Sequence, residues 1–157
     1  MTNYRPEGFS TLTPMIAVPD AAAAITFYEA VFGARVTTRM DGPDGSVWHC
    51  ELQLESGRLQ LMDANPAFHI VALDPANDDV PFSLALYVPD CDATTAKAVE
   101  LGATIREQPD DFDVTGDRFS SIRDPFGIRW SIMTRAAERT DAEIQAGLDA
   151  WAASMGS

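Results

Sequence analysis

The sequence predicts an α+β fold in which two βαβββ modules follow one another, with a helix added at the C-terminal end. Its length of 157 residues suits one domain, and a hydrophobic content of 46% supplies a core. The chain also repeats itself, because residues 16–36 align with 86–105 and residues 45–63 align with 116–134. Each repeat has room for one strand, one helix and three further strands.

The repeat is anchored by short motifs at nearly constant spacing. Val-Pro-Asp at 18–20 recurs at 88–90, an offset of 88 − 18 = 70, and Gly-Ala at 33–34 recurs at 102–103. Asp20 and Asp90 can each accept amide protons at a helix start, and Gly33 and Gly102 suit a helix end. We therefore predict a strand, a capped helix and a glycine stop in both halves, beginning with strands 13–18 and 82–88.

Three strands follow each helix, separated by turn sequences rich in Gly, Asp and Pro. The predicted strands are 34–40, 47–54 and 58–63 in the first half, and 103–107, 117–123 and 128–134 in the second. An acidic loop at 108–115 is a candidate lid. The capping-box spacing of Thr140 and Glu143 predicts a C-terminal helix. The organisation is thus a single domain 1–157, with modules 11–63 and 82–134, a linker 64–81 and a helical segment 135–157.

Charge and cysteine content narrow the classes of partner. With 11 basic and 24 acidic side chains the formal charge is −13, which repels nucleic acid and anionic membranes and attracts cations. Cys50 and Cys91 are too few for a disulfide scaffold, so both are expected to be reduced. The N-terminal residues carry no signal-peptide pattern, and we expect a cytoplasmic protein without membrane or nucleic-acid partners.

The motifs FYEAVFGA at 27–34 and GDRFSSIRDPFGIRWSIMT at 116–134, within the duplicated pattern, resemble the vicinal-oxygen-chelate superfamily. That superfamily includes glyoxalase I, extradiol dioxygenases, fosfomycin-resistance enzymes and bleomycin-resistance proteins, and the PhnB-like group is the most similar. The resemblance covers about residues 11–150. It implies the glyoxalase/bleomycin-resistance fold, in which curved sheets enclose a cleft, and it implies a homodimer.

The resemblance also indicates where a metal would be bound. Metal-using members place one His or Glu ligand on the first and last strand of each half, and the matching positions here are Thr13, Leu61, Ser83 and Ser131. A one-residue alignment error would put Gln60 in place of Leu61. None of these residues is a usual metal ligand. We therefore expect no metal and no cofactor.

Alternation along the strands predicts which side chains face the cleft and which face the helices. Cleft-facing positions are more polar than a core requires, which favours a binding site over a partly wet interior without function. Helix-facing positions include Met62, whereas Trp48 fits either a core or an aromatic wall. The predicted ligand-binding residues are Thr13, Met15, Trp48, Leu61, Asp63, Ser83, Tyr87, Arg129 and Ser131.

His49 and Glu51 are weak candidates for catalysis. They lie two residues apart on one strand and so share a face, where His49 could act as a general base oriented by a carboxylate. The alternative is an ordinary polar pair on the surface. Cys50 between them faces the other way, which disfavours a Cys–His nucleophile.

The leading hypothesis for function is a metal-free small-molecule-binding protein of the glyoxalase/bleomycin-resistance type. It would sequester an organic, antibiotic-like and cationic ligand in its cleft without chemistry. The alternative is an enzyme of the superfamily, a lyase, isomerase or dioxygenase, with a displaced metal site or acid–base catalysis. A third class is an interaction module whose cleft is incidental.

Overall fold

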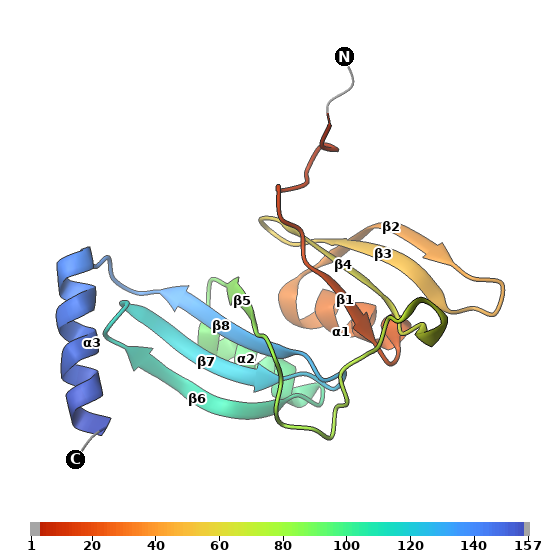
Figure 1. The fold of residues 1–157 in the computed structure, drawn as a ribbon. Coiled ribbons are helices and arrows are strands. Elements are labelled where there is room, and N and C mark those ends of the chain that lie inside the picture. Colours follow the sequence, from red (N-terminus) through yellow and green to blue (C-terminus); the bar gives the residue numbers. More distant parts are fainter. Residues whose placement is uncertain (1–3, 156–157) are drawn as a thin grey trace. The chain divides into compact units, whose positions relative to one another are not determined.

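The computed structural model describes residues 4–155 and divides into two compact units. One unit contains Met1–Val80 and Pro125–Ile128, and the other contains Pro81–Asp124 and Arg129–Ser157. Each unit is built around one four-stranded sheet with one helix on it (Figure 1).

The first unit has the predicted order of one strand, one helix and three strands. Its sheet has the order β1-β4-β3-β2, with β1 parallel to β4 and the other pairs antiparallel. A short 3-10 helix, Pro66–Phe68, follows within the predicted linker. The elements are β1 (Met15–Val18), α1 (Ala21–Phe32), β2 (Arg35–Asp41), β3 (Val47–Gln53) and β4 (Arg58–Asp63).

The second unit repeats this topology, with its sheet in the order β5-β8-β7-β6 and β5 parallel to β8. The α+β class and the tandem βαβββ arrangement are therefore confirmed. The elements are β5 (Leu84–Tyr87), α2 (Cys91–Glu100), β6 (Thr104–Phe112), β7 (Asp117–Arg123), β8 (Arg129–Arg135) and α3 (Asp141–Met155).

Both sheet-covering helices begin as their sequences predict. The side chain of Asp20 accepts the amide proton of Ala23 at 2.9 Å, and that of Asp90 accepts the amide proton of Ala93 at 2.8 Å. Gly33 ends α1 with φ of 64°, a left-handed conformation that costs glycine little. The matching caps explain why one sequence motif starts both helices.

The two helices pack on their sheets by different chemistry. Helix α1 buries Phe27, Tyr28 and Val31, and the ring of Phe126 lies 6.0 Å from Phe27 and 6.3 Å from Tyr28. Apolar burial and aromatic edge contacts thus stabilise this layer.

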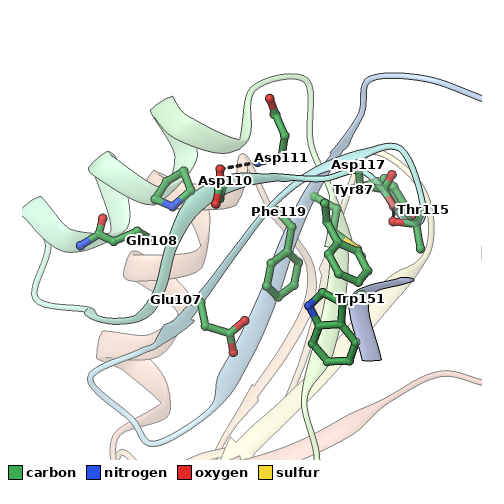
Figure 2. Close-up of a pocket in the computed structure, with 12 residues that line it drawn as sticks. Tyr87, Glu107, Gln108, Asp110, Asp111, Thr115, Asp117, Phe119 and Trp151 are labelled. Atoms are coloured by element: carbon green, nitrogen blue, oxygen red, sulfur yellow. Dashed lines mark hydrogen bonds between the residues drawn. The ribbon is translucent and has the colours of Figure 1, made fainter. Parts of the chain in front are cut away.

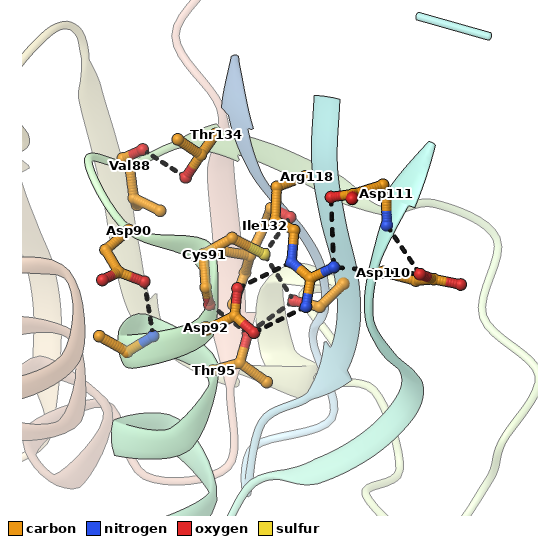
Figure 3. Close-up of polar contacts among 12 residues, drawn as sticks. Val88, Asp90, Cys91, Asp92, Thr95, Asp110, Asp111, Arg118, Ile132 and Thr134 are labelled. Carbon is orange, nitrogen blue, oxygen red and sulfur yellow. Dashed lines mark hydrogen bonds and ion pairs between the residues drawn. The ribbon is translucent and has the colours of Figure 1, made fainter. Parts of the chain in front are cut away.

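Helix α2 instead meets its sheet through a buried polar cluster (Figure 3). Thr95 Oγ1 lies 2.6 Å from Ser120 Oγ, and Cys91 Sγ donates to the carbonyl oxygen of Ile132 at 3.3 Å. All four residues are at most 2% exposed. Because Ser120 and Ile132 face α2, their neighbours in sequence on β7 and β8 face the opposite side, which we call the open face of the second sheet.

One predicted boundary is wrong. Residues 108–112 are not part of a loop, because β6 runs to Phe112 and pairs with β7 through two register shifts. Pro109 lies in an edge strand beside such a shift, where a missing amide proton is tolerated. Within the predicted helical segment 135–157, the helix begins at Asp141, directly after the predicted capping-box residue Thr140, since Arg135 belongs to β8. Residues 156–157 of that prediction lie outside the described residues.

The predicted orientation of β4 is also wrong. Leu61 is fully buried and pairs with Ile16, so it faces α1, whereas Met62 pairs with Ala17 on the other face. The prediction used a constant offset of 70, but Leu61 corresponds to Ile132, and 132 − 61 = 71. A slip of one residue exchanges the two faces of a strand.

Within residues 4–155, no helix combines the length and the apolar character needed to cross a membrane.

Candidate ligand-binding site

A cavity of about 820 Å³ lies on the open face of the second sheet, between its strands and helix α3 (Figure 2). Its floor is provided by β5, β7 and β8, one wall by β6 and the following turn, and the other wall by α3. The lining residues are Tyr87, Glu107–Phe112, Thr115, Asp117, Phe119, Met133 and Trp151.

Strand register arranges the open face of the sheet in two rows, of which the first lines the cavity. Tyr87 pairs with Met133, which pairs with Phe119, and these three form the apolar row. Two residues further along the strands, Ala85 pairs with Ser131, Ser131 with Ser121, and Ser121 with Glu107. We call this second set the hydroxyl row, after the two serines at its centre. It consists of Ala85, Ser131, Ser121 and Glu107.

Helix α3 closes the cavity with a single aromatic side chain. The indole of Trp151 meets the ring of Phe112 edge-on, with centroids 6.4 Å apart. One turn earlier, a Cβ at Gly147 would lie 3.3 Å from Val114 Cα, so the helix approaches the β6–β7 turn closely. The helix starts at the predicted capping box, in which the Thr140 amide donates to Glu143 Oε2 at 2.7 Å.

The carboxylate of Asp117 at one end of the cavity is ion-paired with Arg135. Asp117 is 5% exposed, accepts from Thr115 Oγ1 at 2.7 Å and lies 3.3 Å from Arg135 Nε. Arg135 also lies over the Tyr87 ring, 5.9 Å from its centroid. These contacts fix the orientation of Tyr87 beside the apolar row.

Arg118 supports the β6 wall from outside the cavity. It donates to both carboxylate oxygens of Asp92, at 2.8 and 2.9 Å, and to Asp111 at 3.2 Å (Figure 3). The hydrogen bond from Arg118 lowers the pKa of Asp92, and the same contact raises the pKa of Arg118. In Figure 2 the Asp111 carboxylate points away from the aromatic side chains of the cavity. Its contact with Arg118 therefore stabilises the β6 wall.

A second polar network lies beyond the apolar row. Arg129 Nε donates to Ser121 Oγ at 3.0 Å, and its Nη2 donates to Glu107 Oε1 at 2.6 Å. Ser83 Oγ lies 3.0 Å from Ser131 Oγ. The structure therefore brings three predicted site residues, Ser83, Arg129 and Ser131, together on one face, and Tyr87 lies on the same face.

The predicted site residues of the first unit have separate environments. Met15 is 58% exposed on the face opposite α1, and the half-buried Thr13 precedes β1. The indole of Trp48 packs over the β2–β3 turn, where a Cβ at Gly42 would lie 2.3 Å from Nε1. For Thr13, Met15 and Trp48, contact with a ligand stays a prediction.

Leu61 and Asp63 have structural roles in the first unit. Leu61 is part of the core beneath α1. The Asp63 carboxylate accepts the amide protons of Ala21 at 2.7 Å and Val47 at 2.6 Å. Asp63 thus joins the start of α1 to the start of β3, and the expectation that it faces the cleft is corrected.

His49 and Glu51 share a face of β3, as predicted, with side chains 19% and 15% exposed. His49 Nε2 lies 3.4 Å from Glu51 Oε1, and Arg58 Nη1 donates to Glu51 Oε2 at 2.8 Å. Arg58 lies in turn under the ring of Phe9, 4.3 Å from its centroid. Cys50 is buried on the opposite face, where burial raises the pKa of its thiol and so opposes thiolate chemistry.

The positions where metal-using relatives carry ligands do not fit a divalent metal. With the corrected register they hold Thr13, Gln60, Ser83 and Ser131, whose neutral hydroxyl and amide oxygens are poor ligands for such ions. Among residues 4–155, no group of three or more His, Cys, Asp or Glu side chains is placed to hold a metal ion. No chemical step through a metal is therefore derived from these residues.

Of the lining residues, only Tyr87 is among the predicted ligand-binding residues, and the aromatic residues Phe112, Phe119 and Trp151 and the acidic Glu107 are among those that were missed. Phe119 could have been found, because alternation on 117–123 places it on the face opposite Ser120. Trp151 lies on the C-terminal helix, and no sequence signal indicates which surface that helix covers.

Comparison with known proteins identifies the family. The sequence model of the Glyoxalase/Bleomycin resistance protein/Dioxygenase superfamily matches residues 11–132. The uncharacterized protein Mb0911c of Mycobacterium bovis is 34% identical over 139 residues, which cover 87% of this chain and 91% of that protein.

Two further likenesses support this result. The anthracycline biosynthesis protein DauV of Streptomyces sp. (strain C5) is 29% identical over 119 residues, or 75% of this chain and 38% of DauV. A solved structure of a PhnB protein from Bacillus cereus has a TM-score of 0.62 at 17% identity, covering 80% of this chain and 99% of that one, which shows the shared fold. The chain belongs to the glyoxalase/bleomycin resistance protein/dioxygenase superfamily.

Proposed function

We propose that this protein binds a small organic molecule that combines a planar apolar body with a positively charged group. The cavity of about 820 Å³ on the second sheet carries this proposal, because its volume falls within the range of small-molecule sites, about 300–1,000 Å³. It also unites aromatic surface with a few polar groups, which is the usual composition of such sites.

The body of the ligand is expected to lie between the apolar row and Trp151. Phe119, Met133 and Tyr87 supply a flat floor, and the indole of Trp151 supplies the opposite wall. Aromatic rings gain from such contacts beyond the area they bury, and a methionine adapts its shape to the ring above it.

The charge preference follows from the lining residues. Four of them are acidic (Glu107, Asp110, Asp111 and Asp117), and the lining set itself contains no Lys, Arg or His. Arg129, Arg118 and Arg135, which lie outside the lining set, offset part of this negative charge. The chain as a whole carries −13, which adds a long-range attraction for cations at low salt. A cationic ligand is therefore favoured over an anionic one of the same shape.

Sequestration without chemistry is the role that we propose for this binding. The donor set at the family's metal positions supports this choice, and the name of the relative DauV, an anthracycline biosynthesis protein, supports a small organic ligand. Resistance to an antibiotic of this chemistry would follow from sequestration. We further propose a homodimer, to be tested by light scattering, and a cytoplasmic location, in which Cys50 and Cys91 stay reduced.

The test uses three probes of nearly identical shape and different charge: 2-(2-naphthyl)ethylamine, 2-(2-naphthyl)ethanol and 2-naphthylacetate. Calorimetric titration should rank their affinities in that order, with the amine binding about tenfold more tightly than the alcohol. Raising the salt concentration should weaken the amine and leave the alcohol unchanged. Equal affinities, or a preference for 2-naphthylacetate, would contradict the proposal.

A pair of variants locates the site. Phe119→Ala should weaken the amine and the alcohol alike, by about tenfold, because the floor of the cavity is lost. Met40→Ala is the control, since Met40 is an apolar side chain, 53% exposed, on β2 of the first unit. If the control variant loses as much affinity as Phe119→Ala, the probes bind elsewhere.

The chain of contacts from His49 through Glu51 to Arg58 favours a second candidate function, acid–base catalysis by an enzyme of the superfamily. A carboxylate held by an arginine can orient a histidine that accepts a proton. Elemental analysis of protein purified without chelator, followed by thermal titration with Zn²⁺, Mn²⁺, Ni²⁺ and Fe²⁺, tests the metal-dependent form of this alternative. Stoichiometric metal, and turnover that is lost in His49→Gln, would favour it over sequestration.

A further inference from the structure

The hydroxyl row and Arg129 form a polar strip beside the apolar row. All the side chains in it come from the second unit, and three hydrogen bonds of 2.6 to 3.0 Å link Arg129 to Glu107 and Ser121, and Ser83 to Ser131. Ser131 and Ser83 occupy positions at which metal-using relatives carry ligands. Here the hydrogen-bond donors of a guanidinium and of hydroxyl groups take that place.

The polar strip contains one hydrogen-bond donor and one acceptor that can still bind a ligand. No hydrogen bond within residues 4–155 uses Arg129 Nη1 or Glu107 Oε2. The side chains of Arg129 and Glu107 are 34% and 52% exposed, so solvent reaches both. A donor and an acceptor thus stand side by side, joined by a contact of 2.6 Å.

The charges of the strip nearly cancel, because Glu107 compensates Arg129. Such a pair gives little net attraction for a free carboxylate or phosphate. It suits a ligand in which a carbonyl group is attached to the carbon that bears an ammonium group. The carbonyl oxygen would accept from Arg129 and from Ser131 Oγ, and the ammonium would donate to Glu107.

The spacing of the two rows matches one compact molecule. Two residues along a strand span roughly 6.5 Å, which separates the apolar row from the hydroxyl row. An aromatic ring over the apolar row therefore places its side chain over the hydroxyl row when two or three bonds join them. The small side chains of Ala85 and Ser131 leave room for it, whereas Ser121 is fully buried beside Arg129.

We infer that the site recognises arylalkyl amines in which a carbonyl group is attached to the carbon that bears the amine, as in an aromatic α-amino amide. The inference rests on the proposed function, because the aromatic body must first occupy the cavity. It adds that Arg129 and the hydroxyl row donate hydrogen bonds to the carbonyl oxygen of the ligand.

The experiment compares 3-(2-naphthyl)alaninamide with 2-(2-naphthyl)ethylamine, which lacks the carbonyl group. Titrations at about pH 6.5 keep both amines protonated. In the unmodified protein the amide should bind about tenfold more tightly, since it adds two hydrogen bonds. 3-(2-Naphthyl)propanamide, which lacks the ammonium, should bind more weakly than either amine.

The variants Arg129→Lys and Ser131→Ala should each reduce that gain, measured as the ratio of the two affinities in the same variant, to less than about threefold. Arg39→Lys is the matched control, because Arg39 is also ion-paired and similarly exposed, at 36%, but lies in the first unit. The control should keep the full gain.

The outcomes separate the two proposals. If 2-(2-naphthyl)ethylamine binds and the amide shows no gain, or if the gain survives in both variants, the inference is overturned and the proposed function stands. If neither compound binds, both are overturned. A gain that is lost in Arg129→Lys and Ser131→Ala, but kept in Arg39→Lys, supports the inference.

Discussion

The two units share one topology, yet their open faces have become different. In the first unit, the face opposite α1 carries the contacts among His49, Glu51 and Arg58, and Phe9 from the N-terminal segment lies over Arg58. In the second unit, the corresponding face carries a cavity whose far wall is α3. One duplicated scaffold thus supports a covered polar network in one copy and an accessible hollow in the other.

The difference between the two open faces shows that the helix-facing side of each sheet determines the fold. On the helix side, Ile16 pairs with Leu61 just as Leu86 pairs with Ile132, and all four are apolar. On the open side, corresponding positions hold unlike residues, since Gln60 corresponds to Ser131. The helix side preserves the fold, and the open side is free to acquire function.

The largest effect expected is on the helix side. Leu61→Ala and Ile132→Ala each remove a side chain that is fully buried at corresponding positions. Each should lower the free energy of unfolding by about 3 kcal/mol, because a cavity remains in the core. Denaturant titration measures both losses. Gln60→Ala and Ser131→Ala on the open faces should cost less than about 1 kcal/mol, and an equally small loss for Leu61→Ala would show that Leu61 faces the open side.

An intermediate effect distinguishes the ends of β4 and β8. Asp63 accepts two amide protons, whereas the corresponding Thr134 makes one hydrogen bond, from Oγ1 to the Val88 carbonyl oxygen at 2.9 Å. Asp63→Ala should cost about 2 kcal/mol, since two donors lose their acceptor, and Thr134→Val about 1 kcal/mol. Thermal unfolding of both variants and of Asp63→Asn measures this difference. Equal losses would mean that Asp63 does not join α1 to β3 in solution.

The smallest effect concerns α3, which has no counterpart in the first unit. Hydrogen bonds from the backbone and side chain of Thr140 lower the pKa of Glu143. The contribution of Glu143 to helix stability is therefore present above the ordinary glutamate pKa of about 4.3, and it is lost as pH falls through the lowered value.

Hydrogen exchange of peptides from 141–155, corrected for the intrinsic rate at each pH, measures this change. Protection should fall on acidification in the unmodified protein. The variant Glu143→Gln should show lower protection at neutral pH and a weaker dependence on pH. Identical profiles for the two proteins would contradict a role for the capping box.

The sequence predicted the elements that depend on local chemistry. Asp20 and Asp90 cap helices because a carboxylate can accept amide protons wherever the backbone turns, and Gly33 ends a helix because of its backbone freedom. The grouping of Ser83, Tyr87, Arg129 and Ser131 on one face followed from strand alternation within a correctly registered module.

What the sequence could not predict depends on register and on packing between distant segments. An offset of 71 instead of 70 exchanged the faces of β4, and neither Leu61 nor Gln60 signals its own orientation. The cavity requires α3 to lie beside the β6–β7 turn, and that contact between Trp151 and Phe112 joins residues 39 positions apart (151 − 112 = 39). Local propensity carries no information about such a contact.

The close approach at Gly147 gives the chain a simple way to diverge. This position lies against Val114 rather than the cavity, so a side chain there larger than a methyl group needs α3 or the β6–β7 turn to shift. Trp151 lies one helical turn further on, so its indole would move with the helix. A single substitution away from the site could therefore change the thickness of the molecules admitted while preserving every group that contacts them. Under selection for new ligands, substitutions at Gly147 would then precede substitutions of the residues that line the cavity.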